Sequence, residues 1–207
     1  MKILYIDTSS SYLYTAITAD DKLLVEIKEE FGHNLSQEAL PKIASMFEKV
    51  NLEPKDINKI IVVNGPGSFT GIRIGITIAK VYGWSLNIPI TTITSLEAMM
   101  LSSNEACSHV PVIDARRGYV FGAIYDDKNK QILKPQHIKI VDLEQKLKGI
   151  TNYIIITNDD IEITGKREEY NPDILKIVNY FKDKEEINPH AVNPEYLKLT
   201  EAEESKL

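Results

Sequence analysis

The residues best suited to chemistry lie in the turn at 64–71, which reads Asn-Gly-Pro-Gly-Ser-Phe-Thr-Gly. The turn follows a buried-type strand at 60–63 and opens a helix, and free amides at the start of a helix attract phosphate and other anions. Its glycines allow backbone angles closed to other residues, and its hydroxyl side chains can cap the helix. The turn lacks the glycine-lysine-serine/threonine ending of a Walker phosphate loop. A tight strand-to-helix connection is therefore the favoured interpretation, with anion binding as the alternative.

Metal-ligating and nucleophilic residues are few and scattered. The four histidines, His33, His109, His137 and His190, include no pair spaced to hold a metal ion. The single cysteine, Cys107, lies two positions from His109, a spacing that does not place both side chains on one helical face. We therefore expect no metal site and no cysteine nucleophile.

Composition narrows the class of protein. The 207 residues, 43% hydrophobic and 26% charged, are ordinary for one large or two small folded domains. The net charge of −6 disfavours a dedicated nucleic-acid binder, which usually has a basic face. One cysteine excludes an internal disulfide bond. Since the sequence also has no membrane-length apolar run and no signal-type start, we expect a cytoplasmic protein with no membrane association.

A stripe of small residues follows one face of the helix expected at 70–84. Every fourth position is small: Gly71, Gly75, Ala79 and Gly83. Positions four apart share one helical face, and each interior glycine costs about 1 kcal/mol relative to alanine. The stripe therefore predicts close approach of another element, in the same domain or in a partner. The apolar surplus of the preceding helix, 35–50, favours a partner.

An internal repeat predicts a duplicated domain. Residues 6–20 align with residues 113–127, and six positions are identical: Ile6, Asp7, Tyr12, Ala16, Ile17 and Asp20 match Ile113, Asp114, Tyr119, Ala123, Ile124 and Asp127. Each copy has a strand ending in Asp, a short polar turn and a second strand. Third strands are expected at 23–28 and 131–140. We predict one domain at 1–103 and a second, shorter domain at 104–207.

The remaining elements alternate as in α/β proteins. In the first copy we expect helix 35–50, strand 60–64, helix 70–84, strand 88–93 and a helix from Ser95. In the second copy we expect a helix near 142–148, a strand at 152–157 and a helix near 173–182. The last residues, 188–207, are rich in Pro, Asn and Glu and predict an irregular surface strap with a frayed tip.

A duplicated βββαβα unit with Asp at the end of each first strand resembles the actin, hexokinase and Hsp70 ATPase fold, which is ribonuclease-H-like in each half. Within that fold, residues 3–10 and 64–75 resemble the first strand and the signature segment of the TsaB (YeaZ) family. Residues 113–117 and 194–198 resemble weaker landmarks of the same family.

The resemblance implies a non-catalytic subunit of the complex that attaches threonylcarbamoyl to the tRNA adenosine adjacent to the anticodon. It implies binding to a catalytic paralogue, TsaD, and to a small ATPase, TsaE. It further implies a homodimer when the chain is isolated, and contact with tRNA only through the complex. The partner interface is expected on helices 35–50 and 70–84, at Leu40, Ala44, Phe47, Gly71, Arg73, Gly75, Thr77, Ala79, Tyr82 and Gly83.

Proteins of this fold hold nucleotide phosphates between two opposed strand-turn-strand loops. By resemblance, Asp7, Thr8 and Ser9 form a vestigial or shared phosphate loop. The second loop carries Arg116 and Arg117 where the catalytic paralogue has small residues. We therefore expect no cofactor of the chain's own, and ATP or ADP, where one binds, at an interface shared within the complex.

Two other functions of the same fold stay open. A metallopeptidase would agree with an older glycoprotease label for these families, and it would need a set of metal ligands. A small-molecule kinase would need ATPase activity stimulated by its substrate, and the two arginines of the second loop argue against it.

Overall fold

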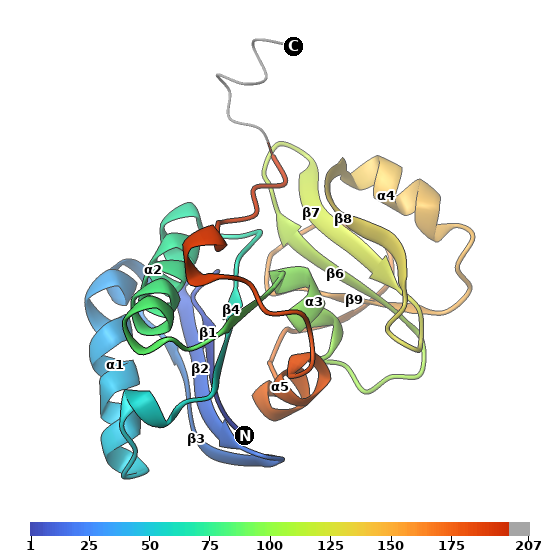
Figure 1. Ribbon diagram of the computed structural model, residues 1–207. Helices are drawn as coiled ribbons and strands as arrows, with labels where there is room; N and C mark the ends of the chain where they lie inside the picture. The colour runs from blue at the N-terminus through green and yellow to red at the C-terminus, as the bar shows by residue number, and fades with distance from the viewer. Residues whose placement is uncertain (199–207) are drawn as a thin grey trace. The chain divides into compact units, whose positions relative to one another are not determined.

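The computed structural model describes residues 1–198, which form two compact α/β units (Figure 1). Unit 1 comprises Met1–Ser95 and Pro172–Glu195, and unit 2 comprises Leu96–Asn171 with the described residues from Tyr196 onward. The predicted boundary lay between 103 and 104, whereas the observed unit 2 starts at Leu96 and the chain returns to unit 1 at Pro172. None of the helices in the described part of the chain is long and apolar enough to cross a membrane.

The sheet of unit 1 has the strand order β3-β2-β1-β4-β5. Its first three strands form an antiparallel meander, while β4 pairs in parallel with β1, and β5 in parallel with β4. The strands are β1 (Lys2–Asp7), β2 (Tyr12–Ala19), β3 (Lys22–Glu30), β4 (Lys59–Val63) and β5 (Ile90–Ile93). The three expected strands and the strand before the glycine-rich turn are therefore confirmed.

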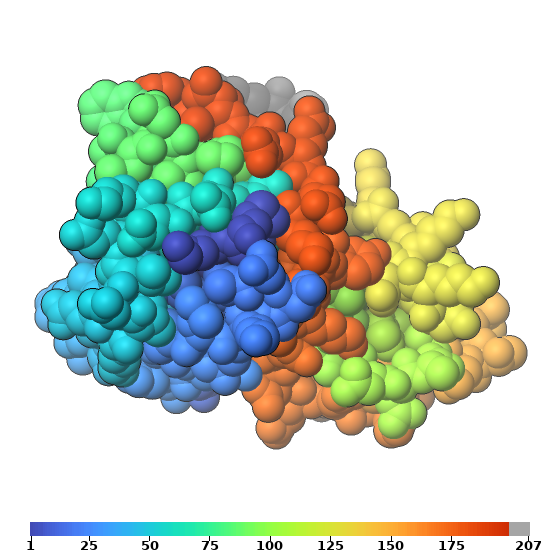
Figure 2. Space-filling view, turned by 60° about the horizontal axis from the view of Figure 1, so that its bottom comes forward, coloured from blue at the N-terminus to red at the C-terminus, as the bar shows by residue number. Residues whose placement is uncertain are grey.

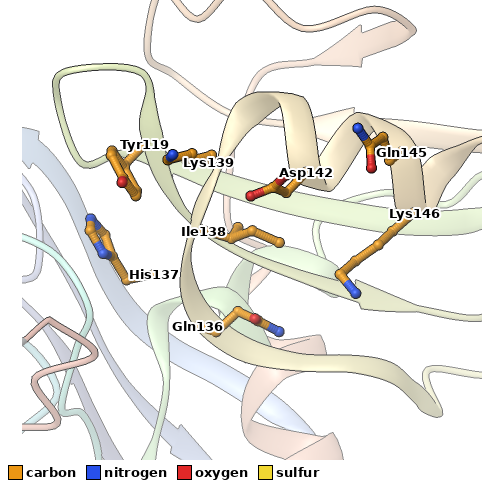
Figure 3. A pocket seen from close by; sticks show the side chains of 8 residues that line it. All are labelled: Tyr119, Gln136, His137, Ile138, Lys139, Asp142, Gln145 and Lys146. Atoms are coloured by element: carbon orange, nitrogen blue, oxygen red, sulfur yellow. The ribbon is translucent and has the colours of Figure 1, made fainter.

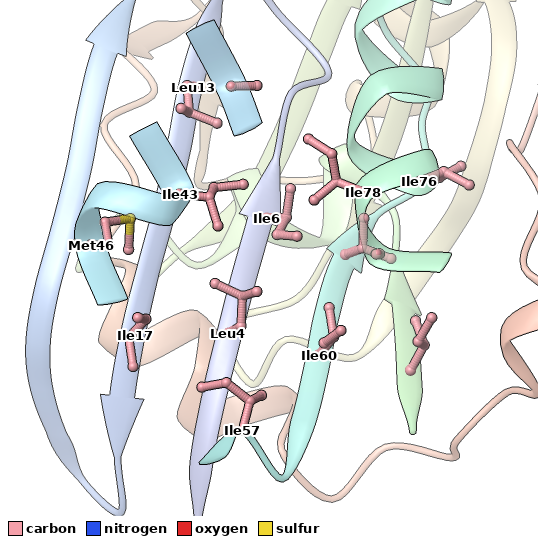
Figure 4. Close-up of a cluster of buried hydrophobic side chains, with 14 of the residues drawn as sticks. Leu4, Ile6, Leu13, Ile17, Ile43, Met46, Ile57, Ile60, Ile76 and Ile78 are labelled. Atoms are coloured by element: carbon pink, nitrogen blue, oxygen red, sulfur yellow. The ribbon is translucent and has the colours of Figure 1, made fainter. Parts of the chain in front are cut away.

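Two helices of unit 1, α1 (Leu35–Lys49) and α2 (Phe69–Leu86), lie side by side on one face of its sheet (Figure 1). Fully buried side chains of β1, β2 and β4 meet those of α1 and α2 in the core (Figure 4). The largest of them are Leu4, Ile6, Leu13, Ile17, Ile43, Met46, Ile60 and Ile72. This apolar burial fixes both helices on the sheet, since each buried aliphatic side chain contributes about 1.5–3 kcal/mol. Short 3-10 helices lie at Gly32–Asn34 and Pro54–Asp56.

Unit 2 repeats this topology. Its strand order, β10-β9-β6-β7-β8, is that of unit 1 read from the other end, with an antiparallel meander followed by two parallel strands. The elements are α3 (Ser95–Met100), which starts at the unit boundary, β6 (Ser108–Asp114), β7 (Tyr119–Tyr125), β8 (Gln131–Lys139), α4 (Ile140–Leu147), β9 (Tyr153–Ile156) and β10 (Lys166–Glu168). The duplication is confirmed, and the second copy is shorter because residues 157–165, between β9 and β10, form no helix.

Residues 172–195, which include a helix, belong to unit 1. Helix α5 (Ile174–Phe181), which we expected to belong to the second copy, contacts β1 and β2 instead. Its apolar residues Ile174, Ile177, Val178 and Phe181 are buried. After α5, the Ile187 amide donates to the Ile90 carbonyl oxygen at 2.7 Å, and a 3-10 helix follows at Pro189–Ala191. The space-filling view shows these orange-red residues packed beside the blue residues of the N-terminus (Figure 2). The expected frayed tip lies outside the described residues.

A buried lysine of β4 binds the segment that follows α5, residues 182–186. Lys59 is only 4% exposed, and its ammonium donates to the carbonyl oxygens of Lys182 at 2.7 Å and Lys184 at 3.1 Å. The carboxylate of Glu186 lies 3.4 Å away. A buried charge is tolerated only where hydrogen bonds and a counter-charge replace its hydration, as they do here.

We predict that Lys59→Met lowers the free energy of unfolding by about 1–3 kcal/mol, because two carbonyl oxygens lose a charged donor. Urea unfolding at neutral pH measures the change. Lys55→Met, at an exposed lysine paired only with exposed Glu53, is the matched control and should stay within about 0.5 kcal/mol of the parent. Equal effects of the two substitutions would contradict the anchoring role.

Candidate functional site

The glycine-rich turn packs onto the loop between β1 and β2. The Ser68 amide donates to the Ser9 carbonyl oxygen at 2.7 Å, and the Ser68 hydroxyl accepts from the Gly71 amide at 3.2 Å as the N-cap of α2. Gly67 has a φ of +151°, and a Cβ there would overlap the Ser9 carbonyl oxygen. The polar groups of the turn named here therefore bind other residues of unit 1. The turn is a tight strand-to-helix connection, as predicted.

The side chain of Thr8 inserts into the first turns of α2. Its hydroxyl donates to the Gly71 carbonyl oxygen at 2.7 Å and accepts from the Gly75 amide at 3.0 Å. Gly71 and Gly75 are an i, i+4 pair, so the hydroxyl lies where the helix would otherwise make its own hydrogen bond. A Cβ at Gly71 would overlap the Thr8 carbonyl oxygen, and a Cβ at Gly75 would overlap the Thr8 hydroxyl. Glycine is therefore required for this approach of strand and helix.

The small-residue stripe consequently faces its own sheet. Gly71, Gly75, Ala79 and Gly83 are buried, and a Cβ at Gly83 would meet the side chain of Ile90. Phe47 is buried as well, in the core between α1 and the sheet. The expectation that these five residues contact a partner is corrected: in this fold they are covered by unit 1 itself. The spacing correctly predicted close approach, but it could not tell which element approaches.

Four of the other predicted interface residues lie on the outward side of the two helices, whereas Tyr82, nine positions after Arg73 and so on the opposite side of α2, packs against the core. Leu40, Ala44, Arg73 and Thr77 are exposed, and Tyr82 is half-buried with its ring 6.2 Å from that of Phe47. The outward side carries three large apolar residues that sequence reasoning missed: Phe69 at 53%, Val81 at 57% and Trp84 at 65% exposure. The outer α1–α2 face is the name used below for Leu40 together with positions 44, 69, 73, 77, 81 and 84.

Arg73 is held on this face by an aromatic neighbour. Its guanidinium lies 3.7 Å from the centroid of the Phe69 ring, one helical turn earlier. Such a cation–π contact contributes about 0.5–1 kcal/mol at an exposed site. Trp84, farther along α2, has an edge contact with the ring of His190 at 6.0 Å. The face therefore presents arginine and aromatic side chains with defined neighbours.

The predicted phosphate loop of unit 1 is internally bonded. Asp7 is 2% exposed and accepts from the Ser9 amide at 2.8 Å, while Thr8 is fully buried in its contacts with α2. Burial raises the pKa of the Asp7 carboxyl above its usual range, and the hydrogen bonds from Ser9 and Tyr5 offset only part of that rise. Assignment of Asp7, Thr8 and Ser9 to a shared nucleotide site stays a prediction.

The corresponding loop of unit 2 differs. Asp114 is exposed, and its carboxylate accepts from the Arg116 amide at 2.8 Å, so it caps the turn. Arg116 and Arg117 have φ values of +65° and +55°, in the left-handed region that ordinarily favours glycine. The two copies of the aspartate therefore have different surroundings: Asp7 is buried and Asp114 lies at the surface.

The histidines and the cysteine lie apart. His109 is buried, with Nε2 3.1 Å from the Glu105 carbonyl oxygen. Cys107 is buried, and burial raises the pKa of its thiol. Within residues 1–198, no group of three or more His, Cys, Asp or Glu side chains is placed to hold a metal ion.

The two units and their matching strand orders define a duplicated actin-like fold of the ATPase type, with the second unit abbreviated. The family model for TsaD, described as tRNA N6-adenosine threonylcarbamoyltransferase, matches residues 27–165, more than half of the chain. The tRNA threonylcarbamoyladenosine biosynthesis protein TsaB of Bacillus subtilis is 33% identical, over 98% of this chain and 96% of its own. Escherichia coli TsaB is 30% identical over 66% of this chain and 64% of its own. The chain belongs to the TsaB (YeaZ) family.

Solved structures agree on the fold. YeaZ from Pseudomonas aeruginosa superposes with a TM-score of 0.75 at 17% identity, covering 95% of this chain and 99% of its own. A second protein of that organism, described as similar to peptidase YeaZ, gives a TM-score of 0.78 at 16% identity over the same shares. At these identities the likeness concerns the fold alone.

We predict that Gly75→Ala destabilises the protein even though alanine favours a helix by about 1 kcal/mol. The added Cβ collides with the Thr8 hydroxyl, and overpacking of this kind costs about 1–3 kcal/mol. In a Thr8→Ala background the collision is absent, and the same Gly75→Ala change should become neutral or stabilising. Urea unfolding of the four proteins gives the coupling. Stabilisation by Gly75→Ala in the parent would contradict the insertion of Thr8.

A second prediction concerns Asp7 and pH. Because the pKa of Asp7 is raised by folding, the folded protein binds this proton more tightly than the unfolded chain. Stability therefore falls as pH rises from the usual carboxyl range through the folded-state pKa. Asp7→Asn keeps an acceptor for the Ser9 amide and removes the ionisation. Its thermal midpoint should exceed that of the parent at about pH 7, with the gap shrinking toward about pH 4. A gap of opposite sign at neutral pH would refute this account.

Proposed function

We propose that this chain is a non-catalytic subunit in tRNA threonylcarbamoyladenosine biosynthesis and that it acts by binding a TsaD-like catalytic paralogue. The observation that carries the proposal is the outer α1–α2 face. The names of the B. subtilis and E. coli relatives support the pathway, and the match to the TsaD family model supports a paralogous relation between the two subunits.

The chemistry of the outer face supports a protein partner. Single exposed apolar residues are normal on a protein surface, but several large ones on one side of it favour an interaction site. Here Leu40, Phe69, Val81 and Trp84, each at least half exposed, come from two neighbouring helices. Tryptophan and arginine are the residue types that most often dominate binding energy at interfaces, and Arg73 is already ordered over Phe69.

The loops support a role without an active site of this chain's own. The first loop uses its backbone and hydroxyl groups to hold α2, and the second places two arginines where small residues would leave room for phosphates. We propose accordingly that any ATP or ADP binds at an interface shared in the complex. A TsaE-like ATPase joins that complex, and tRNA is contacted through the complex. The complex acts in the cytoplasm. In isolation, the same outer face pairs two copies of the chain.

We predict that Trp84→Ala weakens binding to the catalytic paralogue by roughly 30- to 1000-fold, the range expected of a tryptophan hot spot. The side chain is mostly exposed, so the fold should be retained. Isothermal titration with the purified partner measures the affinity, and circular dichroism verifies folding. Ile132→Ala, at an apolar residue of unit 2 that is also more than half exposed, is the matched control and should bind normally. Unchanged binding by Trp84→Ala with a defect in the control would place the interface elsewhere.

The function itself is tested by transfer of labelled threonine to tRNA. The reaction contains ATP, bicarbonate and the partner enzymes, with and without this chain. Transfer that requires both this chain and the catalytic paralogue would support the proposal. Full transfer in the absence of this chain would refute it.

A further inference from the structure

The free edge of the unit 2 sheet carries a hollow of ≈ 670 Å³ (Figure 3). Strand β8 pairs only with β7, so its other edge is unpaired within the sheet. The hollow extends from the side chains of Tyr119 and His137, past Lys139, to the exposed residues Gln145 and Lys146 of α4. These residues have no part in the outer α1–α2 face, which belongs to unit 1.

The aromatic residues at one end of the hollow form a short stack. Cross-strand pairing places Tyr119 opposite Lys139 and Phe121 opposite His137, so all four side chains lie on the same side of the sheet. The rings of Tyr119 and His137 are nearly parallel, with centroids 4.6 Å apart and planes inclined by 9°. Phe121 lies beyond, 5.5 Å from His137. His137 lies against both Tyr119 and Phe121 and its Nε2 is buried, so the partly exposed ring of Tyr119 is the one on which another flat ring can stack.

The charged groups around the stack are mostly basic. The Lys139 ammonium lies 5.8 Å from the centroid of the Tyr119 ring, and Lys146 also lines the hollow. The one carboxylate in the lining is that of Asp142. Arg116 and Arg117 lie exposed in the turn just before Tyr119. Flat aromatic rings beside cationic side chains are the combination that binds the bases and phosphates of single-stranded nucleic acid.

We propose that this hollow binds an unpaired nucleotide of single-stranded RNA. The base stacks on the Tyr119 ring, and Lys139, on the same side of the sheet, pairs with a flanking phosphate. Gln136, Gln145 and Lys146 line the hollow on the α4 side of β8, where the neighbouring nucleotide passes the free edge of the sheet. An acidic peptide would use the lysines but would leave the Tyr119 ring without a flat partner. The proposal rests on the proposed function, which supplies tRNA as the RNA.

The net charge of −6 makes the contact weak for the isolated chain, so it adds to RNA contacts made by partners. This departs from the expectation that tRNA is contacted only through the complex. The chain would supply one local contact from unit 2, while the assembly supplies most of the binding.

The test is direct binding of a labelled eight-nucleotide single-stranded RNA to the full chain, measured by fluorescence anisotropy at low salt. Lys139→Glu combined with Lys146→Glu should weaken binding by roughly tenfold or more, because two positive charges that line the hollow are reversed. Lys128→Glu combined with Lys130→Glu, exposed lysines near the turn between β7 and β8, makes the same change in charge outside the hollow and should bind within about twofold of the parent. Tyr119→Leu should also weaken binding, since it removes a stacking ring.

Each other result would overturn the proposal. No saturable binding by the parent chain, equal losses in the two double variants, or equal competition by a polyglutamate peptide would each do so. The assay contains no partner protein, so it separates this proposal from the proposed function. If threonine transfer does not need the chain but RNA binding still depends on Lys139 and Lys146, only the proposed function fails. If transfer needs the chain but the double variant binds RNA normally, only the RNA site fails.

Discussion

The position of α2 on the sheet of unit 1 depends on one buried hydroxyl group. Thr8, at the end of β1, bonds both to a carbonyl and to an amide of α2, and thereby joins the sheet to the helix at the glycine-rich turn. This contact requires glycine at positions 71 and 75, which explains the small-residue stripe without a partner. It also fixes the rotation of α2 on the sheet. Since the stripe faces inward, Phe69, Arg73, Thr77 and Trp84 must face outward, and the outer α1–α2 face is a geometric consequence of the same bond.

The duplication has diverged where chemistry would be expected. In unit 1 the aspartate at the end of the first strand is buried, and burial raises its pKa. In unit 2 the equivalent Asp114 is exposed and caps a left-handed turn that contains two arginines. Unit 2 also has no helix between β9 and β10 to match α2. Unit 1 therefore has a helix, α2, that unit 2 lacks, while unit 2 has an aromatic and basic sheet edge.

Much of the fold could be predicted because the internal sequence repeat shows that the same run of strands occurs twice. The aligned positions around Asp7 and Asp114 define two equivalent meanders, and both sheets show the implied strand order. The helix near 173–182 was placed correctly along the chain but in the wrong unit, since an amphipathic segment does not specify which sheet it covers. The glycine spacing predicted close packing of α2. The exposure of Phe69, Val81 and Trp84 was not predicted, because they are apolar and their exposure follows only once the glycine stripe is known to face the sheet. The stacked pair Tyr119–His137 depends on strand register, which single-sequence patterns leave undefined.

The central claim is that this chain contributes binding, and no chemical step, through the outer α1–α2 face. The most direct measurement is the rate of threonylcarbamoyl transfer as a function of the concentration of this chain, for the parent and for Trp84→Ala. The account predicts the same maximal rate for both proteins, with half-saturation shifted to roughly 30-fold or higher concentration in the variant. A lower maximal rate at unchanged half-saturation would contradict it, because that result would assign the face a part in the reaction itself.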